Sequence, residues 1–424
     1  MSRILRHIIA GLLIPAAVAQ GETFTLKNCL SEAKSSNTTL RVAAYDQTIA
    51  AEGERIGKSG YLPRVDIQGG YTVQLDPQAI DLGNGRTVAT QQKDYTFASL
   101  GIYQTLYDFG RTDARAGHAR TLREAALYNY AGHEQDVFLK VVTAYFGILQ
   151  AQKLVQSAED EVVQMTEHLR VARNLYEQGV VTRNDLLQAE VRLAGSQQSR
   201  MDSINRRDNA WLLLNYLIDR KPDFRADLEE GATLPYSAVT TAPLAQVPAD
   251  HPEIKALEKA VEGSEFDVQE SKGGYYPELF AKAGLDYVQN RQVKEQAIMA
   301  ATIGVKFNLF DGQATTGRYR QAIATRSRSE QALRQVKAAL GLEYRMAVND
   351  ANVSMERIKV SEKAILQGEE NLRINKERYQ AQVGTATDVI DAQTLLTQAR
   401  TDYYRSMFDY QVAVARIKKA RGEL

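Results

Sequence analysis

The chain has 424 residues, 44% of them hydrophobic and 25% charged, and its 52 Lys and Arg balance 52 Asp and Glu. This neutral composition excludes recognition of nucleic acid through a basic surface, so we expect no nucleic-acid partner. The single cysteine, Cys29, excludes an intramolecular disulfide. Cys29 follows Leu26-Lys27-Asn28 rather than small residues, which disfavours lipid attachment at this position.

Residues 1–19 predict a secretory signal peptide. Arg3 and Arg6 precede an apolar run over residues 8–18, and the run ends in small residues typical of a cleavage site. No later stretch approaches the ~18 apolar residues that a transmembrane helix needs. An exported chain of this kind is periplasmic, secreted, or inserted in a membrane as a β-barrel.

An internal duplication organises the rest of the chain. The segment 176–189 recurs without a gap 203 positions later, at 379–392. Upstream, an offset of 214 relates Gly-Tyr-Leu-Pro at 60–63 to Gly-Tyr-Tyr-Pro at 274–277, so 11 residues were gained or lost at one loop. A duplication of this size predicts one fold built from two similar halves.

Proline marks the boundary between the halves, because five of the nine prolines lie between residues 222 and 252. We therefore expect a first repeat over 20–220, a Pro-rich linker or equatorial segment over 221–250, and a second repeat over 251–424.

Each repeat is predicted to contain a helix, a β-hairpin, a long helix and a return helix. At 1.5 Å per residue, the roughly 66 positions of each long helix would span about 100 Å. Helices of this length indicate a coiled coil or a helical tube of antiparallel hairpins. The expected bounds of hairpin, long helix and return helix are about 64–107, 111–177 and 184–218 in the first repeat, and about 278–310, 313–381 and 387–421 in the second.

The hairpin segments alternate with period two. Val65 and Ile67 share one face while Asp66 and Gln68 share the other, and Ile303, Val305, Phe307 and Leu309 alternate similarly in a return strand. Such tracts fit the lipid-facing and lumen-facing sides of a barrel, although a sheet covering a soluble core has the same pattern. Lipid tolerates no open sheet edge, so four strands per chain must close with strands of other chains. Twelve strands from three chains leave room for a polar lumen, whereas eight do not, so we expect a trimer.

No catalytic or metal-binding constellation is evident. The histidines His7, His118, His133, His168 and His251 are too scattered for a metal cluster, and no His-Glu-x-x-His motif is present. We therefore predict a protein that is not an enzyme and that needs no cofactor or metal.

The chain resembles the TolC-type outer-membrane factors, the outer membrane efflux protein family. The resemblance rests on the duplication, on the Gly-Tyr-Leu-Pro and Gly-Tyr-Tyr-Pro joints, and on Leu-Tyr-Asp-Phe-Gly at 106–110 and Leu-Phe-Asp-Gly at 309–312. The most specific element runs from Tyr379 to Gln393 and is similar to the family's Tyr-x-x-Gly…Asp-Val-Leu-Asp-Ala-Gln element.

The resemblance implies a homotrimeric exit duct of a tripartite efflux pump or a type I secretion system. Its fold would be mainly α with a transmembrane β-barrel of 12 strands, set in outer-membrane lipid, above a periplasmic helical tube. Its partners would be a periplasmic adaptor and an inner-membrane transporter, and cargo would pass through it passively. The alternative is a structural or adhesive coiled-coil protein of the cell envelope without a pore.

The resemblance also implies a gate at the hairpin tips. Asp388 and Asp391 match the paired aspartates of the family's periplasmic aperture, and Tyr379 matches an aromatic residue that helps to keep it closed. At the offset of 203 residues, the counterparts in the first repeat are Asp185, Gln188 and Tyr176.

Two residues depart from the family's pattern at this gate. Gln382 stands where a glycine is usual, and Gly384 replaces what can be an arginine. For the aspartates a second interpretation stays open, because Asp185 and Asp388 lie in the first turn of a helix, where a carboxylate favours the N-terminus. We further expect crowded carboxylates at an aperture to have raised pKa values.

Overall fold

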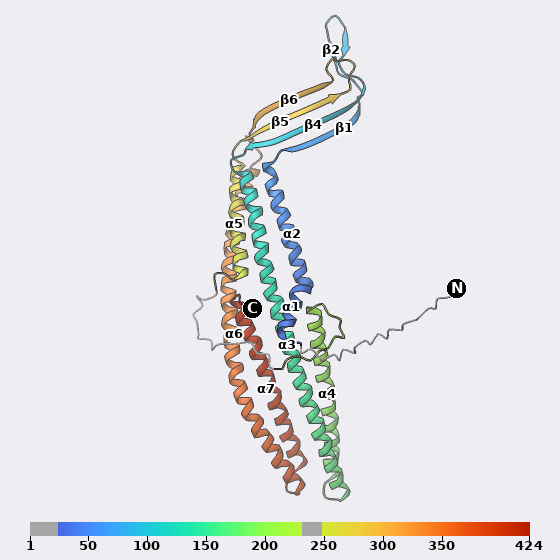
Figure 1. Cartoon of the computed structure of the whole chain (residues 1–424), viewed down its shortest axis with the longest axis vertical. Coiled ribbons are helices and arrows are strands. Elements are labelled where there is room, and N and C mark those ends of the chain that lie inside the picture. The colour runs from blue at the N-terminus through green and yellow to red at the C-terminus, as the bar shows by residue number, and fades with distance from the viewer. Residues whose placement is uncertain (1–23, 231–247) are drawn as a thin grey trace, which may run out of the picture. The chain divides into compact units, whose positions relative to one another are not determined.

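The computed structural model of the chain describes residues 24–230 and 248–424 (Figure 1). The expected signal peptide and the residues 231–247 of the linker lie outside this range. The described residues divide into two compact units, one formed by residues 24–37, 140–230 and 350–414 and the other by residues 38–139, 248–349 and 415–424. We refer to them as unit 1 and unit 2.

The fold is mainly helical, as predicted, and its helices repeat in length. The long helices α3 and α6 have 67 residues each, and the return helices α4 and α7 have 35 each. The helices are α1 (Leu26–Ser36), α2 (Thr38–Lys58), α3 (Arg111–Glu177), α4 (Arg183–Leu217), α5 (Pro252–Gly273), α6 (Ala314–Gln380) and α7 (Ala386–Ala420), with a short 3₁₀ turn η1 (Ser59–Tyr61). No described helix combines the length and the apolar character needed to cross a membrane.

Four antiparallel strands form one sheet in unit 2, in the order β1-β4-β5-β6. The two hairpins join through the pairing of β4 with β5, in which Leu100 lies opposite Leu285. The strands are β1 (Arg64–Val73), β4 (Asp94–Tyr107), β5 (Glu278–Val288) and β6 (Ala297–Lys306). The outer strands β1 and β6 have no further partner strand in the described part of the chain.

One face of this sheet is apolar from edge to edge. The register places Ile67 opposite Leu100, Leu100 opposite Leu285, and Leu285 opposite Met299, so one row crosses all four strands. All four side chains are exposed in the single chain. The alternation read in the sequence therefore puts a continuous apolar face on the surface, and no core formed by the described residues covers it.

The first hairpin contains two strands that the sequence analysis did not predict. β2 (Ala79–Asp81) and β3 (Thr87–Ala89) pair with each other in the connection between β1 and β4. This connection spans residues 74–93, whereas its counterpart between β5 and β6 spans only 289–296, so the extra residues of the first repeat lie here. Asn84-Gly85, a strong hairpin turn signal, was the clue in the sequence.

The return strand of the second hairpin is shorter than expected. We expected Phe307 and Leu309 to continue the alternation, but β6 ends at Lys306. Lys306 pairs with Glu278, the first residue of β5, so the residues beyond it have no ladder partner. In β4 the register shifts between Thr105 and Tyr107, a bulge beside Gln104, which interrupts the alternation in the sequence.

Several of the largest fully buried side chains lie in the middle of α3. Tyr145, Phe146 and Ile148 are completely buried there, and the Tyr145 hydroxyl donates to the backbone oxygens of Phe24 and Glu229. Cys29 is also completely buried, and this burial, followed by the nearby Glu32 carboxylate, raises the pKa of its thiol to about 12. The only cysteine is therefore chemically inert at neutral pH.

Candidate functional site at the hairpin tips

Both long helices end in the same hydrogen-bonded turn. At the end of α3, the Gly179 N–H donates to the Tyr176 oxygen (2.9 Å) and the Val180 N–H donates to the Leu175 oxygen (2.9 Å). This pair of bonds is the Schellman motif, which requires a left-handed residue at Gly179, and its φ is 71°.

The end of α6 repeats this turn with a different residue at its critical position. The Gln382 N–H donates to the Tyr379 oxygen (3.1 Å) and the Val383 N–H to the Arg378 oxygen (2.9 Å). Gln382 therefore occupies the left-handed position, with a φ of 64°, where the first repeat has glycine. Only Gly, and less readily Asn or Asp, adopts this conformation without cost, so Gln382 is a strained residue at the tip.

The presence of glycine at position 384 is explained by close packing. A β-carbon at this position would lie 3.1 Å from the β-carbon of Arg378 and 3.2 Å from the backbone nitrogen of Tyr379. The chain that leaves α6 thus passes so close to the helix that a β-carbon at position 384 would fit only if this turn shifted by a few tenths of an ångström.

The return helices begin with equivalent capping boxes. The Asp185 N–H donates to Thr182 Oγ1 (3.3 Å) while the Thr182 N–H donates to Asp185 Oδ2 (3.0 Å). In the second repeat, the Asp388 N–H donates to Thr385 Oγ1 (3.2 Å) and the Thr385 N–H donates to Asp388 Oδ2 (2.9 Å). Both aspartates are therefore helix caps within the chain.

The pKa of Asp388 follows from this role. The Thr385 backbone N–H and then its hydroxyl stabilise the carboxylate, with a smaller contribution from Arg378, and together they lower the pKa. Within one chain the pKa of Asp388 is therefore lowered, because its hydrogen bonds favour the ionised form. The raised pKa expected from crowded carboxylates concerns the assembled aperture and stays a prediction. Asp391 lies one turn further along α7 and is exposed.

The two tip tyrosines lie in different environments despite their equivalent sequence positions. The Tyr379 side chain is only 4% exposed, and its ring packs against that of His168 with centroids 5.3 Å apart. Its hydroxyl is buried and forms no hydrogen bond with any described residue. Tyr176 is 39% exposed. The second-repeat tip is thus anchored by an aromatic contact that the first-repeat tip lacks within one chain.

The Tyr379–His168 contact belongs to a line of contacts between the two helical hairpins of unit 1, which we call the intrachain seam. Lys376 Nζ contacts Gln164 Oε1, Thr387 Oγ1 lies 3.4 Å from Gln188 Oε1, and Arg192 Nη2 donates to Thr394 Oγ1 (2.7 Å). The seam consists of Gln164, His168, Gln188 and Arg192 from the first repeat and Lys376, Tyr379, Thr387 and Thr394 from the second.

The polar groups of the seam are incompletely satisfied. His168 Nε2 and Arg192 Nε are buried without a hydrogen-bond partner among the residues that the structure describes. Burial, and secondarily the Lys376 charge, lowers the pKa of His168, which keeps the ring neutral. A role for His168 could not be predicted from the sequence, because a single histidine in an apolar helical stripe carries no signal of its partners.

A second feature that recurs in both repeats lies where a strand is followed by a long helix. Asp108 Oδ2 accepts hydrogen bonds from the Thr112 N–H (2.8 Å) and hydroxyl (2.6 Å), and Asp311 accepts the same pair from Thr315. These are the aspartates of the two Leu-Tyr-Asp and Leu-Phe-Asp joints. Their carboxylates cap the first turns of α3 and α6.

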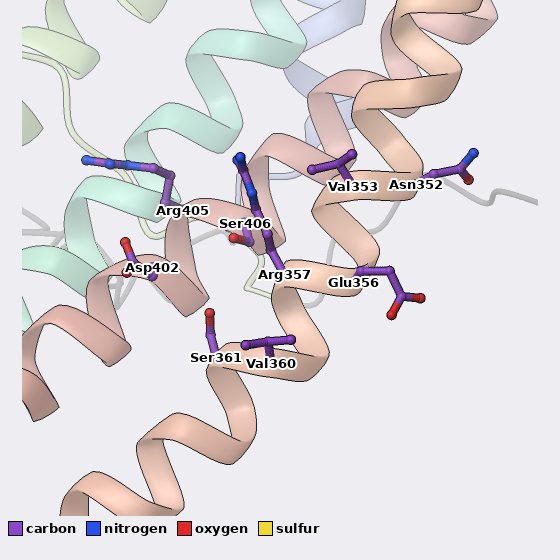
Figure 2. Close-up of a pocket in the computed structure, with 9 residues that line it drawn as sticks. All are labelled: Asn352, Val353, Glu356, Arg357, Val360, Ser361, Asp402, Arg405 and Ser406. Atoms are coloured by element: carbon purple, nitrogen blue, oxygen red, sulfur yellow. The ribbon is translucent and has the colours of Figure 1, made fainter.

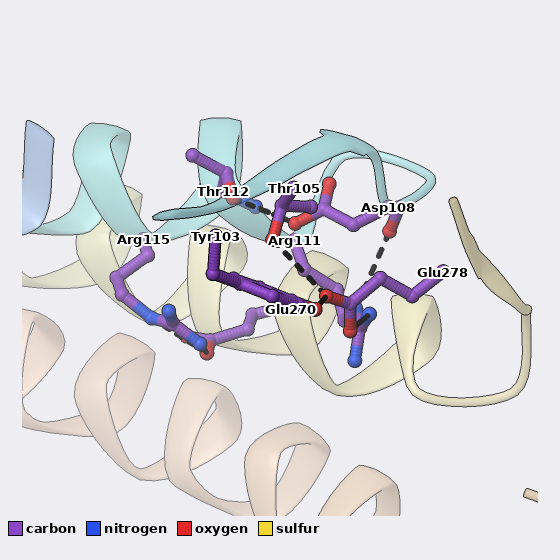
Figure 3. Close-up of polar contacts among 8 residues, drawn as sticks. All are labelled: Tyr103, Thr105, Asp108, Arg111, Thr112, Arg115, Glu270 and Glu278. Atoms are coloured by element: carbon purple, nitrogen blue, oxygen red, sulfur yellow. Dashed lines mark hydrogen bonds and ion pairs between the residues drawn. The ribbon is translucent and has the colours of Figure 1, made fainter. Parts of the chain in front are cut away.

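The first joint carries a further cluster around Glu278 (Figure 3). The Tyr103 hydroxyl (2.8 Å) and the Thr105 hydroxyl (3.0 Å) donate to Glu278 Oε1, and Arg111 Nη2 donates to Oε2 (2.8 Å). These bonds tie strands β4 and β5 to the start of α3. The cluster is a structural brace, since every oxygen of the carboxylate is occupied by the chain itself.

The described residues also contain an open groove between α6 and α7 with a volume of about 710 Å³ (Figure 2). Glu356 and Asp402 line it together with Arg357 and Arg405, and Val353 and Val360 contribute apolar surface. No group of three or more His, Cys, Asp or Glu side chains within residues 24–230 and 248–424 is placed to hold a metal ion.

The architecture defines a class of protein. Duplicated long helical hairpins are joined to an antiparallel sheet whose apolar face and edges are open, and an outer-membrane channel subunit has these features. The family model described as outer membrane efflux protein matches residues 29–218 and 244–423, and the chain belongs to this family.

Known proteins agree with this assignment along nearly the whole chain. The chain is 24% identical to the outer membrane efflux protein BepC of Brucella suis, over 98% of this chain and 89% of BepC. It is 23% identical to the alkaline protease secretion protein AprF of Pseudomonas aeruginosa, over 91% of this chain and 82% of AprF. The CmeC outer membrane channel of Campylobacter jejuni has the same fold, with a TM-score of 0.84 at 14% identity over 94% of this chain and 86% of CmeC. The expected class of function, an outer-membrane exit channel, is confirmed.

Proposed function

We propose that three copies of this chain form the exit duct of a tripartite efflux pump or a type I secretion system. The duct conducts cargo passively from a periplasmic adaptor and an inner-membrane transporter to the outside of the cell. The observation that carries the proposal is the sheet of unit 2, because it has one apolar face across all four strands and unpaired edges at β1 and β6.

An open sheet edge is not stable in lipid, since each unpaired backbone group there costs several kcal/mol. Closure therefore requires strands from other copies, β1 of one chain pairing with β6 of the next. Three chains supply 12 strands, and a barrel of this size encloses a polar interior. Asp66, Gln68 and Asp286 alternate with the apolar row and supply that interior.

We propose that the hairpin tips form the periplasmic aperture and meet the adaptor. Three copies of the exposed Asp388 and Asp391 would ring a narrow opening with carboxylates, where confined like charges attract cations and resist anions. Asp388 would combine this role with its capping role, because its carboxylate remains exposed while it accepts the Thr385 hydrogen bonds. The duct performs no catalysis, and its energy comes from the transporter.

The mass of the purified assembly tests the proposal. With three chains of at most 47.2 kDa each, the protein component of the detergent-extracted particle should weigh at most about 140 kDa. Light scattering with subtraction of the detergent measures this mass. A monodisperse monomer that keeps its β-structure would contradict the closed barrel.

A further inference from the structure

The duplication relates the intrachain seam to a second set of residues, for which the structure of residues 24–230 and 248–424 shows no polar or ring contact between the two hairpins. Adding 203 to each first-repeat seam residue gives Gln367, Asn371, Asp391 and Leu395, and subtracting 203 from each second-repeat residue gives Arg173, Tyr176, Asn184 and Val191. All eight of these side chains are exposed, whereas six of the eight in the intrachain seam are buried or half-buried.

We infer that these eight residues form the contact between neighbouring copies of the chain, in the register that the intrachain seam defines. We call this contact the interchain seam. The inference rests on the proposed trimer and deepens it by naming the surface and its residue pairs. In a ring of alternating first and second hairpins, each hairpin has two flanks, and the intrachain seam covers only one flank of each.

The chemistry of the predicted pairs supports this register. The intrachain contact of Lys376 with Gln164 becomes a contact of Arg173 with Gln367, so a cation again meets a glutamine. The contact of Thr387 with Gln188 becomes one of Asn184 with Asp391, in which an amide donor faces a carboxylate acceptor.

The remaining two pairs carry the apolar part of the seam. Arg192 and Thr394 become Leu395 and Val191, two aliphatic side chains that are 62% and 73% exposed in the single chain. The contact of Tyr379 with His168 becomes a contact of Tyr176 with Asn371, in which the neighbouring chain covers the exposed Tyr176 ring. Exposed aliphatic and aromatic side chains along one flank indicate a surface that another protein buries, and no predicted pair brings like charges together.

Site-directed cross-linking tests the register. Val191→Cys with Leu395→Cys places two thiols on the predicted seam, and a short bismaleimide applied to the full-length protein in outer-membrane vesicles should give covalent dimers and trimers on a denaturing gel. The native Cys29 does not interfere, because it is buried and its thiol remains protonated at neutral pH. Each single-cysteine variant should remain monomeric under the same treatment.

Two matched double variants complete the experiment. Arg192→Cys with Thr394→Cys lies on the intrachain seam and should give a monomer of altered mobility without larger species. Gln198→Cys with Leu395→Cys keeps the same face of α4 but moves the thiol two turns, about 10 Å, along the helix, and should give several-fold less cross-linked product.

The outcomes separate the register from the trimer. If light scattering shows a trimer but the Val191–Leu395 pair gives only monomers, or no more oligomer than the Gln198 variant, the interchain seam is wrong while the proposed duct survives. If the unmodified protein is monomeric, the duct itself is contradicted. Covalent trimers from the in-register pair alone establish the seam.

Discussion

The two hairpin tips have the same backbone and different side-chain environments. Gly179 and Gln382 occupy equivalent left-handed positions, and Thr182–Asp185 and Thr385–Asp388 form equivalent capping boxes. Yet Tyr379 is buried against His168 while Tyr176 is exposed. The two repeats thus share the backbone turn and the capping box. They differ in the residues that surround the tyrosine at the end of the long helix.

The largest expected difference between the tips concerns their tyrosines. Tyr379→Ala should lower the free energy of local opening of the α6–α7 tip by about 3 kcal/mol, because it leaves a cavity in a packed seam. Tyr176→Ala should cost less than half as much at the α3–α4 tip, because the interchain seam sets Tyr176 against Asn371 rather than against an aromatic ring. Amide hydrogen exchange of the tip residues measures both values.

Tyr379→Phe sharpens this prediction. The Tyr379 hydroxyl is buried without a partner within the chain, so its removal should be neutral or stabilising by about 1 kcal/mol. A loss as large as that of the alanine variant would show that the hydroxyl makes a hydrogen bond in the assembly, and the seam described here would then be incomplete.

A smaller effect is expected at the left-handed positions. Gln382→Gly should stabilise the α6–α7 tip by about 1 kcal/mol, because glycine adopts a φ of 64° without the clash of a β-carbon. The reciprocal variant Gly179→Gln should destabilise the α3–α4 tip by a similar amount. Amide hydrogen exchange measures both changes in tip stability. If the two variants changed the stability of their tips in the same direction, the two turns would not be equivalent.

The smallest expected effect is on the pH dependence of stability. It arises from His168 in the intrachain seam, and the equivalent residue of the interchain seam is Asn371, which does not titrate. Burial lowers the pKa of His168 below its ordinary value of 6.5, with Lys376 adding to the effect and Tyr379 covering the ring. The neutral ring therefore contributes stability that is fully present above pH 6.5 and is lost as the pH falls towards the folded-state pKa.

The melting temperature should consequently fall between pH 7.5 and pH 5.5, and His168→Gln should reduce this fall. A part of the fall should remain in the variant, because burial also lowers the pKa of His251 in unit 2. Identical pH profiles for the wild type and the variant would show that His168 is hydrated in the assembled tip.

The structural features that recur in both repeats could be predicted from the sequence. The constant offset of 203 residues predicted paired helices, and α3 and α6 have equal lengths. It also placed Asp185 and Asp388 in the first turns of their helices, where the structure shows both as caps. Patterns of this kind are local, so a single sequence reveals them.

Contacts between distant segments could not be predicted in the same way. Tyr176 and Tyr379 begin nearly the same motif, so nothing local distinguishes the exposed ring from the buried one. The partners of His168, Lys376 and Arg192 depend on which flanks of the hairpins meet. The strands β2 and β3 were missed for another reason, since three-residue strands are too short for a period-two pattern.

The most direct test of the proposed duct is the current through single purified assemblies in a planar lipid bilayer. We predict discrete, cation-selective conductance steps. The double variant Asp388→Asn with Asp391→Asn should still form trimers but should have reduced cation selectivity and weaker block by multivalent cations. The charges at the tip would then control an aqueous path. Absence of conductance from verified trimers would contradict the duct and favour a structural protein of the envelope, whereas unchanged selectivity and block would leave Asp388 only its capping role.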